Sequence, residues 1–94
     1  MIVKQPRDER RKAAAIRYDA EQHAAPRIVA KGAGLLADRI VEIARENGVY
    51  IHEDPDLAAV LSRLDVDTEI PEELYRAVAE ILAFVYRLNQ RMAG

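Results

Sequence analysis

Few side chains in this sequence could act as nucleophiles or general bases. The aliphatic hydroxyl and imidazole groups belong to Ser62, Thr68, His23 and His52. A Ser-His-Asp arrangement would have to pair Ser62 with His52, which lies ten residues earlier at the end of a predicted strand. Ser62 falls within a helical pattern, so we expect it to be an exposed helix residue. The sequence therefore predicts no catalytic residues and a protein that is not an enzyme.

Metal and cofactor motifs are incomplete. The absence of cysteine excludes disulfides, thiolate nucleophiles and thiolate metal sites. Asp65–Glu69 resembles the start of a calcium loop, but Ile70 stands where that loop needs glycine and Arg76 where it needs glutamate. Gly32–Gly34 precedes a predicted helix, yet it lacks the third glycine and the Lys-Ser/Thr pair of phosphate-binding loops. We expect no metal and no cofactor.

Size and composition indicate one small domain. The chain has 94 residues, of which 50% are hydrophobic and 5% aromatic, so its core is built mostly from Ala, Val, Ile and Leu. No apolar run approaches the roughly 18–20 residues needed to span a bilayer. Lys4 and Gln5 follow the first three residues at once, which does not suit a signal peptide. We therefore expect a soluble cytoplasmic protein.

The charge is distributed unevenly along the chain. Residues 1–12 contain five basic and two acidic side chains, a net charge of +3, and the remaining residues sum to −5 for the total of −2. Residues 1–12 also contain Pro6 and show no apolar periodicity, so we interpret them as a mobile basic arm. Such an arm can bind nucleic acid or an anionic membrane surface, although a solvated terminus explains it more simply.

Hydrophobic periodicity predicts the elements that follow. Strands are expected at 27–31 and 49–52, and helices at 35–47, from Asp54-Pro55 to Leu64, and from Pro71 onward. Residues 13–18 are ambiguous, because three alanines favour a helix whereas the alternation of Ile16 and Tyr18 favours a strand. Gly48 should end the first helix in a left-handed conformation, and Asp54 should cap the second. The order predicts a single α/β domain with a small three- or four-stranded mixed sheet packed with about three to four helices. If 27–31 and 49–52 are neighbours, they should be parallel.

Two segments resemble a known family. Ala24–Gly32 and Ile70–Tyr86 are similar to the cytoplasmic domain of the flagellar export-switch protein FlhB and its YscU relatives in type III secretion injectisomes, and the similarity runs from about Ala13 to Leu88. The resemblance implies a small mixed sheet wrapped by helices, and it decides the ambiguous residues 13–18 in favour of a strand. It divides the chain into the arm (1–12), the domain (13–90) and a tail (91–94). The family has a further strand that matches Lys4–Arg7, a poor strand, so we expect that edge to be missing or frayed.

The resemblance breaks at the family's self-cleaving tetrapeptide. In place of Asn-Pro-Thr-His, this chain has Asp8, Glu9, Arg10 and Arg11. The family's cleavage uses the asparagine amide nitrogen as the nucleophile against its own carbonyl, and Asp8 offers only a carboxylate. The resemblance therefore predicts a stand-alone homologue that does not cleave itself and has no membrane domain.

The resemblance also points to a substrate-binding patch. The family is thought to receive short motifs of early export substrates on a small hydrophobic patch, which matches Ala25, Pro26, Ala79 and Leu82 here. Ala79 and Leu82 are three residues apart and share a helix face. Small residues beside a proline would form a shallow apolar site for one side chain of a peptide. The simpler alternative is that Ala79 and Leu82 pack in the core.

The sequence thus favours a non-enzymatic protein-binding module of the flagellar or type III export apparatus. By resemblance, its partners are rod- and hook-type export substrates, export-gate proteins and the length-control protein, at the inner face of the membrane export apparatus. No nucleic acid and no membrane span are expected. The alternative is a nucleic-acid-associated α/β module that uses the basic arm, with a hydrolase remnant as a third option. Two alternatives stay open. The protein could serve a flagellum or an injectisome, and it could replace, assist or compete with a full-length FlhB.

Overall fold

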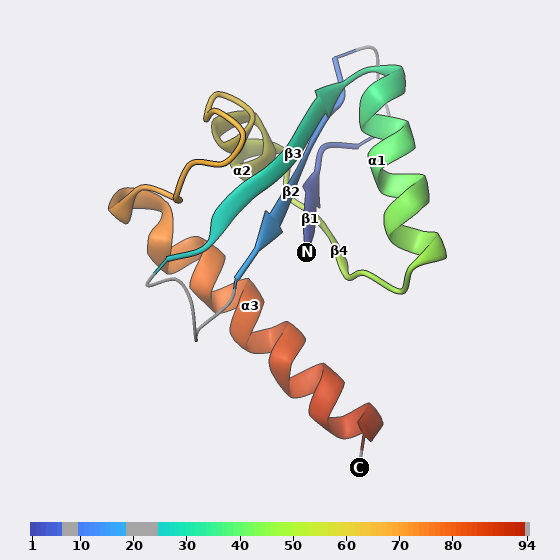
Figure 1. The fold of residues 1–94 in the computed structure, drawn as a ribbon, viewed down its shortest axis with the longest axis vertical. Helices are drawn as coiled ribbons and strands as arrows, with labels where there is room; N and C mark the ends of the chain where they lie inside the picture. Colours follow the sequence, from blue (N-terminus) through green and yellow to red (C-terminus); the bar gives the residue numbers. More distant parts are fainter. Residues whose placement is uncertain (7–9, 19–24, 94) are drawn as a thin grey trace.

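The computed structural model describes residues 1–6, 10–18 and 25–93, the last three by their backbone alone. The elements are β1 (Ile2–Lys4), β2 (Lys12–Arg17), β3 (Arg27–Ala33), α1 (Leu35–Glu46), β4 (Ile51–Glu53), α2 (Pro55–Leu61) and α3 (Glu72–Ala93) (Figure 1). The four strands form one sheet in the order β3-β2-β1-β4. β2 is antiparallel to both its neighbours, whereas β1 and β4 are parallel. The predicted α/β class, with its small mixed sheet, is confirmed.

The expectation that residues 1–12 form a mobile arm is wrong for Ile2–Lys4, which form strand β1. β1 lies inside the sheet between β2 and β4, with Ile2 4% exposed and Val3 fully buried. The two side chains alternate, so one packs on each face of the sheet. The expectation that the strand matching Lys4–Arg7 is missing or frayed is also wrong. The strand is present, but it is shifted to Ile2–Lys4 and lies inside the sheet rather than at its edge. Residues 7–9 lie outside the described part.

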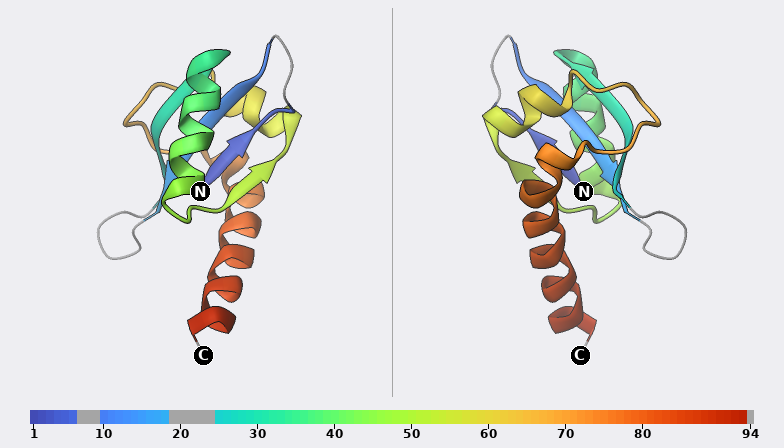
Figure 2. Two further views of the ribbon diagram at one scale, coloured as in Figure 1. Left: turned by 90° about the vertical axis from the view of Figure 1, so that its right-hand side faces the viewer. Right: turned by 90° about the vertical axis from the view of Figure 1, so that its left-hand side faces the viewer.

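The sheet is covered on both faces (Figure 2). α1 packs on one face through Ala37 and Ala44 against Ile2 and Ala13. α2 and α3 pack on the other, where the buried residues form the larger cluster: Val3, Ala14, Ile16, Ile28, Leu57, Ala58, Leu61, Ile70 and Val78. The small alanines of β2 allow both layers to approach the sheet closely.

The predicted C-terminal end of α1 and the predicted N-terminal cap of α2 are confirmed, whereas α2 ends at Leu61, three residues before the predicted Leu64. Gly48 has φ 68° just beyond α1, the left-handed conformation that glycine adopts without strain. Asp54 caps α2 by accepting a hydrogen bond from the Leu57 amide at 3.1 Å, with Pro55 as the first helical residue. Because α1 ends before Gly48 and α2 begins after Asp54, β4 lies between these two helices in the chain.

The strand after α1 does not pair with β3. β4 pairs with β1 in the register Val3↔His52. The expectation that 27–31 and 49–52 are parallel applied only if the two strands were neighbours, and they are not. The edge of β3 is instead covered by the acidic connection after α2. Ile28 donates to the Thr68 carbonyl at 3.0 Å and accepts from the Asp67 amide at 2.7 Å. The acidic run therefore has a structural role at this sheet edge.

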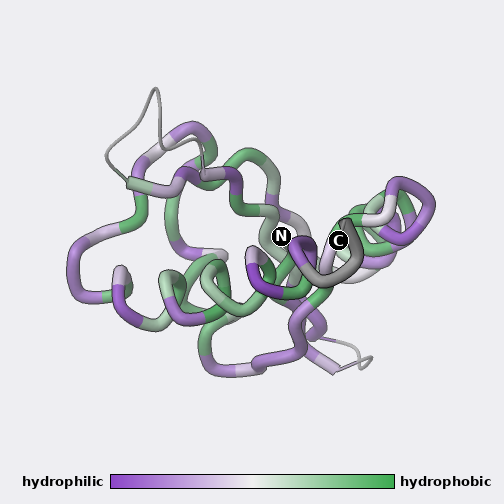
Figure 3. Tube along the Cα trace, turned by 90° about the horizontal axis from the view of Figure 1, so that it is seen from below, coloured by the Kyte–Doolittle hydropathy of each residue, from purple (hydrophilic) through white to green (hydrophobic). Residues whose placement is uncertain are grey.

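α3 is the longest element, with 22 residues. Its first half packs under the sheet and its second half extends past it to the C-terminus (Figures 1 and 2). Hydrophobic and hydrophilic residues alternate along the turns of α1 and α3, as expected of amphipathic helices (Figure 3). Within the described residues, no helix is both long enough and apolar enough to cross a membrane.

Candidate functional site

A groove of about 760 Å³ separates α3 from the adjacent ends of β2 and β3. One wall comes from the end of β2, the chain start and the residue before β3. The other wall is one flank of α3. The lining residues are Met1, Ile16, Arg17, Tyr18, Pro26, Tyr75, Ala79, Leu82, Ala83, Val85, Tyr86 and Asn89.

Three of the four predicted patch residues line this groove. Pro26 is fully buried and forms part of its floor, while Ala79 and Leu82 are half-buried on the α3 wall. Ala25 is half-buried next to Pro26 but does not line the groove. The structure therefore brings Pro26, Ala79 and Leu82 together and leaves Ala25 beside them. Whether the groove binds a peptide stays a prediction.

The position of α3 follows from contacts on either side of its start. The Pro26 carbonyl accepts a hydrogen bond from the Ile70 amide at 2.8 Å, which holds the entry to α3 against the start of β3. Val78 is fully buried in the core. Ala79 follows Val78 by one residue, so it faces about 100° away around the helix, at the border between core and solvent. Leu82 lies one turn later on the same flank and packs against the core from its edge.

Three tyrosines surround the predicted patch and were not assigned to it from the sequence. Tyr18 is 44% exposed and Tyr86 is 64% exposed, while Tyr75 is half-buried. Tyr75 and Tyr86 are eleven residues apart, close to three helical turns, so they lie along one side of α3. That spacing is visible in the sequence, but it equally suits a core stripe. The exposed rings give the groove an aromatic rim.

The degenerate cleavage segment is only partly described. Asp8 and Glu9 lie outside the described residues. Arg10 is exposed in a turn, and Arg11 forms a bidentate ion pair with Asp38 of α1, each oxygen 2.6 Å from a guanidinium nitrogen. The Arg11 carbonyl also accepts from the Gly34 amide at 2.9 Å. The last position of the segment is thereby held to the start of α1.

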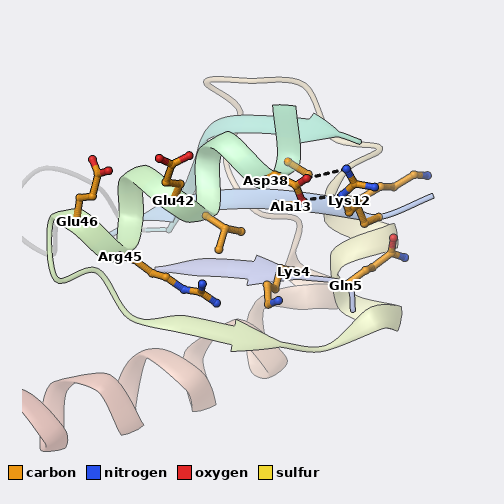
Figure 4. Close-up of a pocket in the computed structure, with 11 residues that line it drawn as sticks. Lys4, Gln5, Lys12, Ala13, Asp38, Glu42, Arg45 and Glu46 are labelled. Atoms are coloured by element: carbon orange, nitrogen blue, oxygen red, sulfur yellow. Dashed lines mark hydrogen bonds and ion pairs between the residues drawn. The ribbon is translucent and has the colours of Figure 1, made fainter. Parts of the chain in front are cut away.

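A second, charged cleft lies beside this ion pair. It has a volume of about 360 Å³ between α1 and the β1–β2 region, and its walls include Lys4, Lys12, Glu42 and Arg45 (Figure 4). Basic and acidic side chains both line it, four and three in number, so it presents no field of one sign to an anionic or cationic ligand.

Ser62, Thr68 and His52 have local partners, and His23 lies outside the described residues. The Ser62 hydroxyl donates to the Ala59 carbonyl at 2.8 Å, and the Thr68 hydroxyl donates to the Asp65 carbonyl at 2.6 Å. His52 lies 3.9 Å from an Asp54 oxygen. Across residues 1–6, 10–18 and 25–93 we find no group of three or more His, Asp or Glu residues placed to hold a metal.

The N-terminal amine borders the groove and is partly buried. It donates to the Ile16 carbonyl at 3.1 Å, and the Ile16 amide donates back to the Met1 carbonyl at 2.8 Å. Burial disfavours the charged amine and lowers its pKa below the usual 8.0. The charge of this amine therefore affects folding stability.

Two known proteins are similar to most of this chain. The chain is 46% identical over 80 residues to the uncharacterized protein YlqH of Bacillus subtilis (strain 168), covering 85% of this chain and 86% of that protein. It is 50% identical over 82 residues to the flagellar biosynthetic protein FlhB of Escherichia coli (strain K12), covering 85% of this chain but only 22% of FlhB. The similarity thus spans nearly all of one relative and about a fifth of the other.

Two solved structures share the fold of this chain, and a family model matches most of its sequence. The cytoplasmic domain of FlhB from Shewanella putrefaciens superposes with a TM-score of 0.86 at 38% identity, covering 99% of this chain and 74% of that one. The PscU C-terminal domain gives a TM-score of 0.72 at 34% identity, covering 77% of this chain and 92% of that one. The model of the FlhB HrpN YscU SpaS family matches residues 7–85, and the chain therefore belongs to this family.

Proposed function

We propose that this FlhB/YscU-like domain of the export apparatus recognises export substrates through the groove beside α3, and that it does so without enzymatic activity. The observation that supports the proposal is the convergence of Pro26, Ala79 and Leu82 on one groove. The resemblance points to these residues, which come from distant parts of the chain and meet at one groove, where Pro26 is buried and the half-buried Ala79 and Leu82 are reached by solvent. A purely structural role for all three would not require such a groove.

The lining suits a short segment with one or two apolar side chains. Ala79 and Ala83 leave space along the helix, and exposed Tyr18 and Tyr86 provide rings that pack against an inserted aliphatic or aromatic side chain. Backbone groups of the segment would stay near solvent at the rim. A contact of this size should give a dissociation constant from tens of micromolar to millimolar, which suits a transient export step.

The proposed partners are rod- and hook-type export substrates, with export-gate and length-control proteins as neighbours at the inner face of the export apparatus. We further propose that the chain acts as a form that does not cleave. Asp8 replaces the asparagine nucleophile, and the Arg11–Asp38 pair holds the adjoining backbone to α1. The surface that would recognise substrates is then present without a cleavage step.

The nucleic-acid alternative loses its main argument. It requires a free basic arm, whereas β1 is inside the sheet. Lys4 lies 3.8 Å from a Glu53 oxygen, and Arg11 is paired with Asp38. These basic groups are therefore compensated locally and would contribute little to a phosphate-binding surface.

The proposal is tested by mapping the binding surface in solution. The ¹⁵N-labelled protein would be titrated with an unlabelled rod- or hook-type export substrate of the same bacterium. We expect amide shifts at Tyr18, Ala79, Leu82 and Tyr86, with α1 unaffected. Shifts confined to α1 or β4, or none at millimolar substrate, would contradict the assigned site.

A further inference from the structure

The two edges of the sheet differ in their hydrogen bonding. At the β3 edge, the segment after α2 pairs with the strand through Asp67, Thr68 and Ile70, and an antiparallel bridge joins Arg27 and Glu69. At the other edge, β4 pairs with β1 on its inner side, and among the described residues nothing pairs with its outer side. β4 is thus an open edge strand.

The hydrogen bonds to β1 show which backbone groups of β4 face the unpaired side of the strand. The Tyr50 carbonyl accepts from the Ile2 amide at 2.9 Å, and the Asp54 amide donates to the Lys4 carbonyl at 3.0 Å. Backbone groups alternate along a strand, so the N–H and C=O groups of Ile51 and Glu53 point away from the sheet. They can pair with an extended chain laid beside β4.

An aromatic pocket lies next to this edge on its α3 side. It has a volume of about 330 Å³ and is lined by Tyr50, His52, Glu80, Ile81 and Phe84. The Tyr50 and Phe84 ring centroids are 5.6 Å apart at 60°, and Tyr50 stacks with His52 at 6.4 Å. Phe84 is 45% exposed, so its ring is available to a ligand.

Two carboxylates lie close to these rings. Glu80 lines the pocket with a side chain that is 73% exposed, and an Asp54 carboxylate oxygen lies 3.9 Å from His52 Nε2. Glu80 forms an ion pair with Arg76 at 3.8 Å, and the Arg76 side chain is 93% exposed, so a stronger ligand could displace it. Ring faces beside carboxylates are complementary to a lysine or arginine side chain.

We propose that the outer edge of β4 binds an extended segment of a partner protein that contains a lysine or arginine. The segment adds a fifth strand through the outward groups of Ile51 and Glu53. Its residue opposite Tyr50 or His52 projects to the α3 side, because directly paired residues of neighbouring strands share a face. The cationic group then lies over the Tyr50 and Phe84 rings and near Glu80.

This site is separate from the groove of the proposed function. The two sites lie on different flanks of α3 and share no lining residue. A partner at β4 and a substrate in the groove could therefore be bound at the same time, and the loss of one need not affect the other. Failure of the groove experiment and failure of the β4 experiment are thus distinguishable.

The test uses two short peptides of matched length and strand propensity. One is acetyl-Thr-Val-Arg-Val-Thr-amide, and the other has glutamate in place of arginine. In ¹⁵N spectra we expect the arginine peptide to shift the Ile51 and Glu53 amides, with millimolar affinity, and to bind at least about threefold more tightly than the glutamate peptide. Ring currents should also move the arginine δ-methylene signal upfield.

Matched variants separate this pocket from general electrostatics. Glu80→Gln removes the carboxylate beside the rings, and Glu42→Gln removes an exposed carboxylate from α1 on the opposite face of the sheet. Glu80→Gln should weaken arginine-peptide binding about threefold, whereas Glu42→Gln should leave it unchanged. Equal effects of the two variants, equal binding of the two peptides, or no shift at β4 would overturn the proposal. So would concentration-dependent shifts of the same amides in the free protein, which would assign the edge to a second copy.

Discussion

Replacing Val3 by alanine tests whether the first residues belong to the core. Val3 is fully buried in the central strand β1 and packs with the α2–α3 cluster. The substitution removes two methylene equivalents, worth about 1.6 kcal/mol at roughly 0.8 kcal/mol each. A residual cavity of roughly 40–50 Å³ adds about 1 kcal/mol. We expect the free energy of unfolding to fall by about 2–3 kcal/mol, a large part of the stability of a domain this size.

Urea denaturation followed by circular dichroism measures this change at an unaltered m-value. Val29→Ala is the matched control, because Val29 is also in a strand but is 43% exposed on β3. That control should cost less than about 1 kcal/mol. A Val3→Ala cost no larger than that of the control would refute the placement of β1 and return residues 1–12 to a mobile arm.

Three further predictions concern the N-terminal region. Arg11→Lys should lower the free energy of unfolding by about 1 kcal/mol, because lysine cannot form the bidentate pair with Asp38; a double-mutant cycle with Asp38→Asn that gives no coupling would contradict this. Burial lowers the pKa of the Met1 amine, so the unfolded chain binds more protons between the folded-state pKa and about 8. Stability should therefore rise with pH through that window in denaturation series from pH 6 to 9, and an acetylated N-terminus should abolish this part of the rise. Intact-mass spectrometry after prolonged incubation should give a single species near 10.6 kDa, and two fragments split between Asp8 and Glu9 would show that the chain cleaves.

Local signals were sufficient for the helices. The Asp54-Pro55 pair and Gly48 specify helix ends through contacts within a few residues, so their roles could be read from the sequence. β1 could not be predicted in the same way. Its three residues are too few for a periodic pattern, and the burial of Val3 depends on pairing with β4, which lies about fifty residues later.

The candidate groove was predicted only in part for a similar reason. Ala79 and Leu82 came from the resemblance, and the helical period places them on one flank of α3. Tyr75 and Tyr86 lie on the same side of this helix, and the sequence alone could not show which of its apolar residues face the core and which face solvent. That division depends on where the sheet ends beneath α3, and this is set by long-range packing around Val78.

The central claim is that the α3 groove recognises export substrates, and one affinity comparison tests it most directly. Isothermal titration calorimetry would give the dissociation constant of a rod- or hook-type substrate for the parent protein, Ala79→Asp and Ala77→Asp. Ala77 is exposed on the same helix but does not line the groove, and thermal melts would confirm that each variant is folded. We predict that Ala79→Asp weakens binding at least about tenfold, because it desolvates a charge in an apolar groove, and that Ala77→Asp leaves it unchanged. Equal affinity of the folded Ala79→Asp protein and the parent would contradict the account.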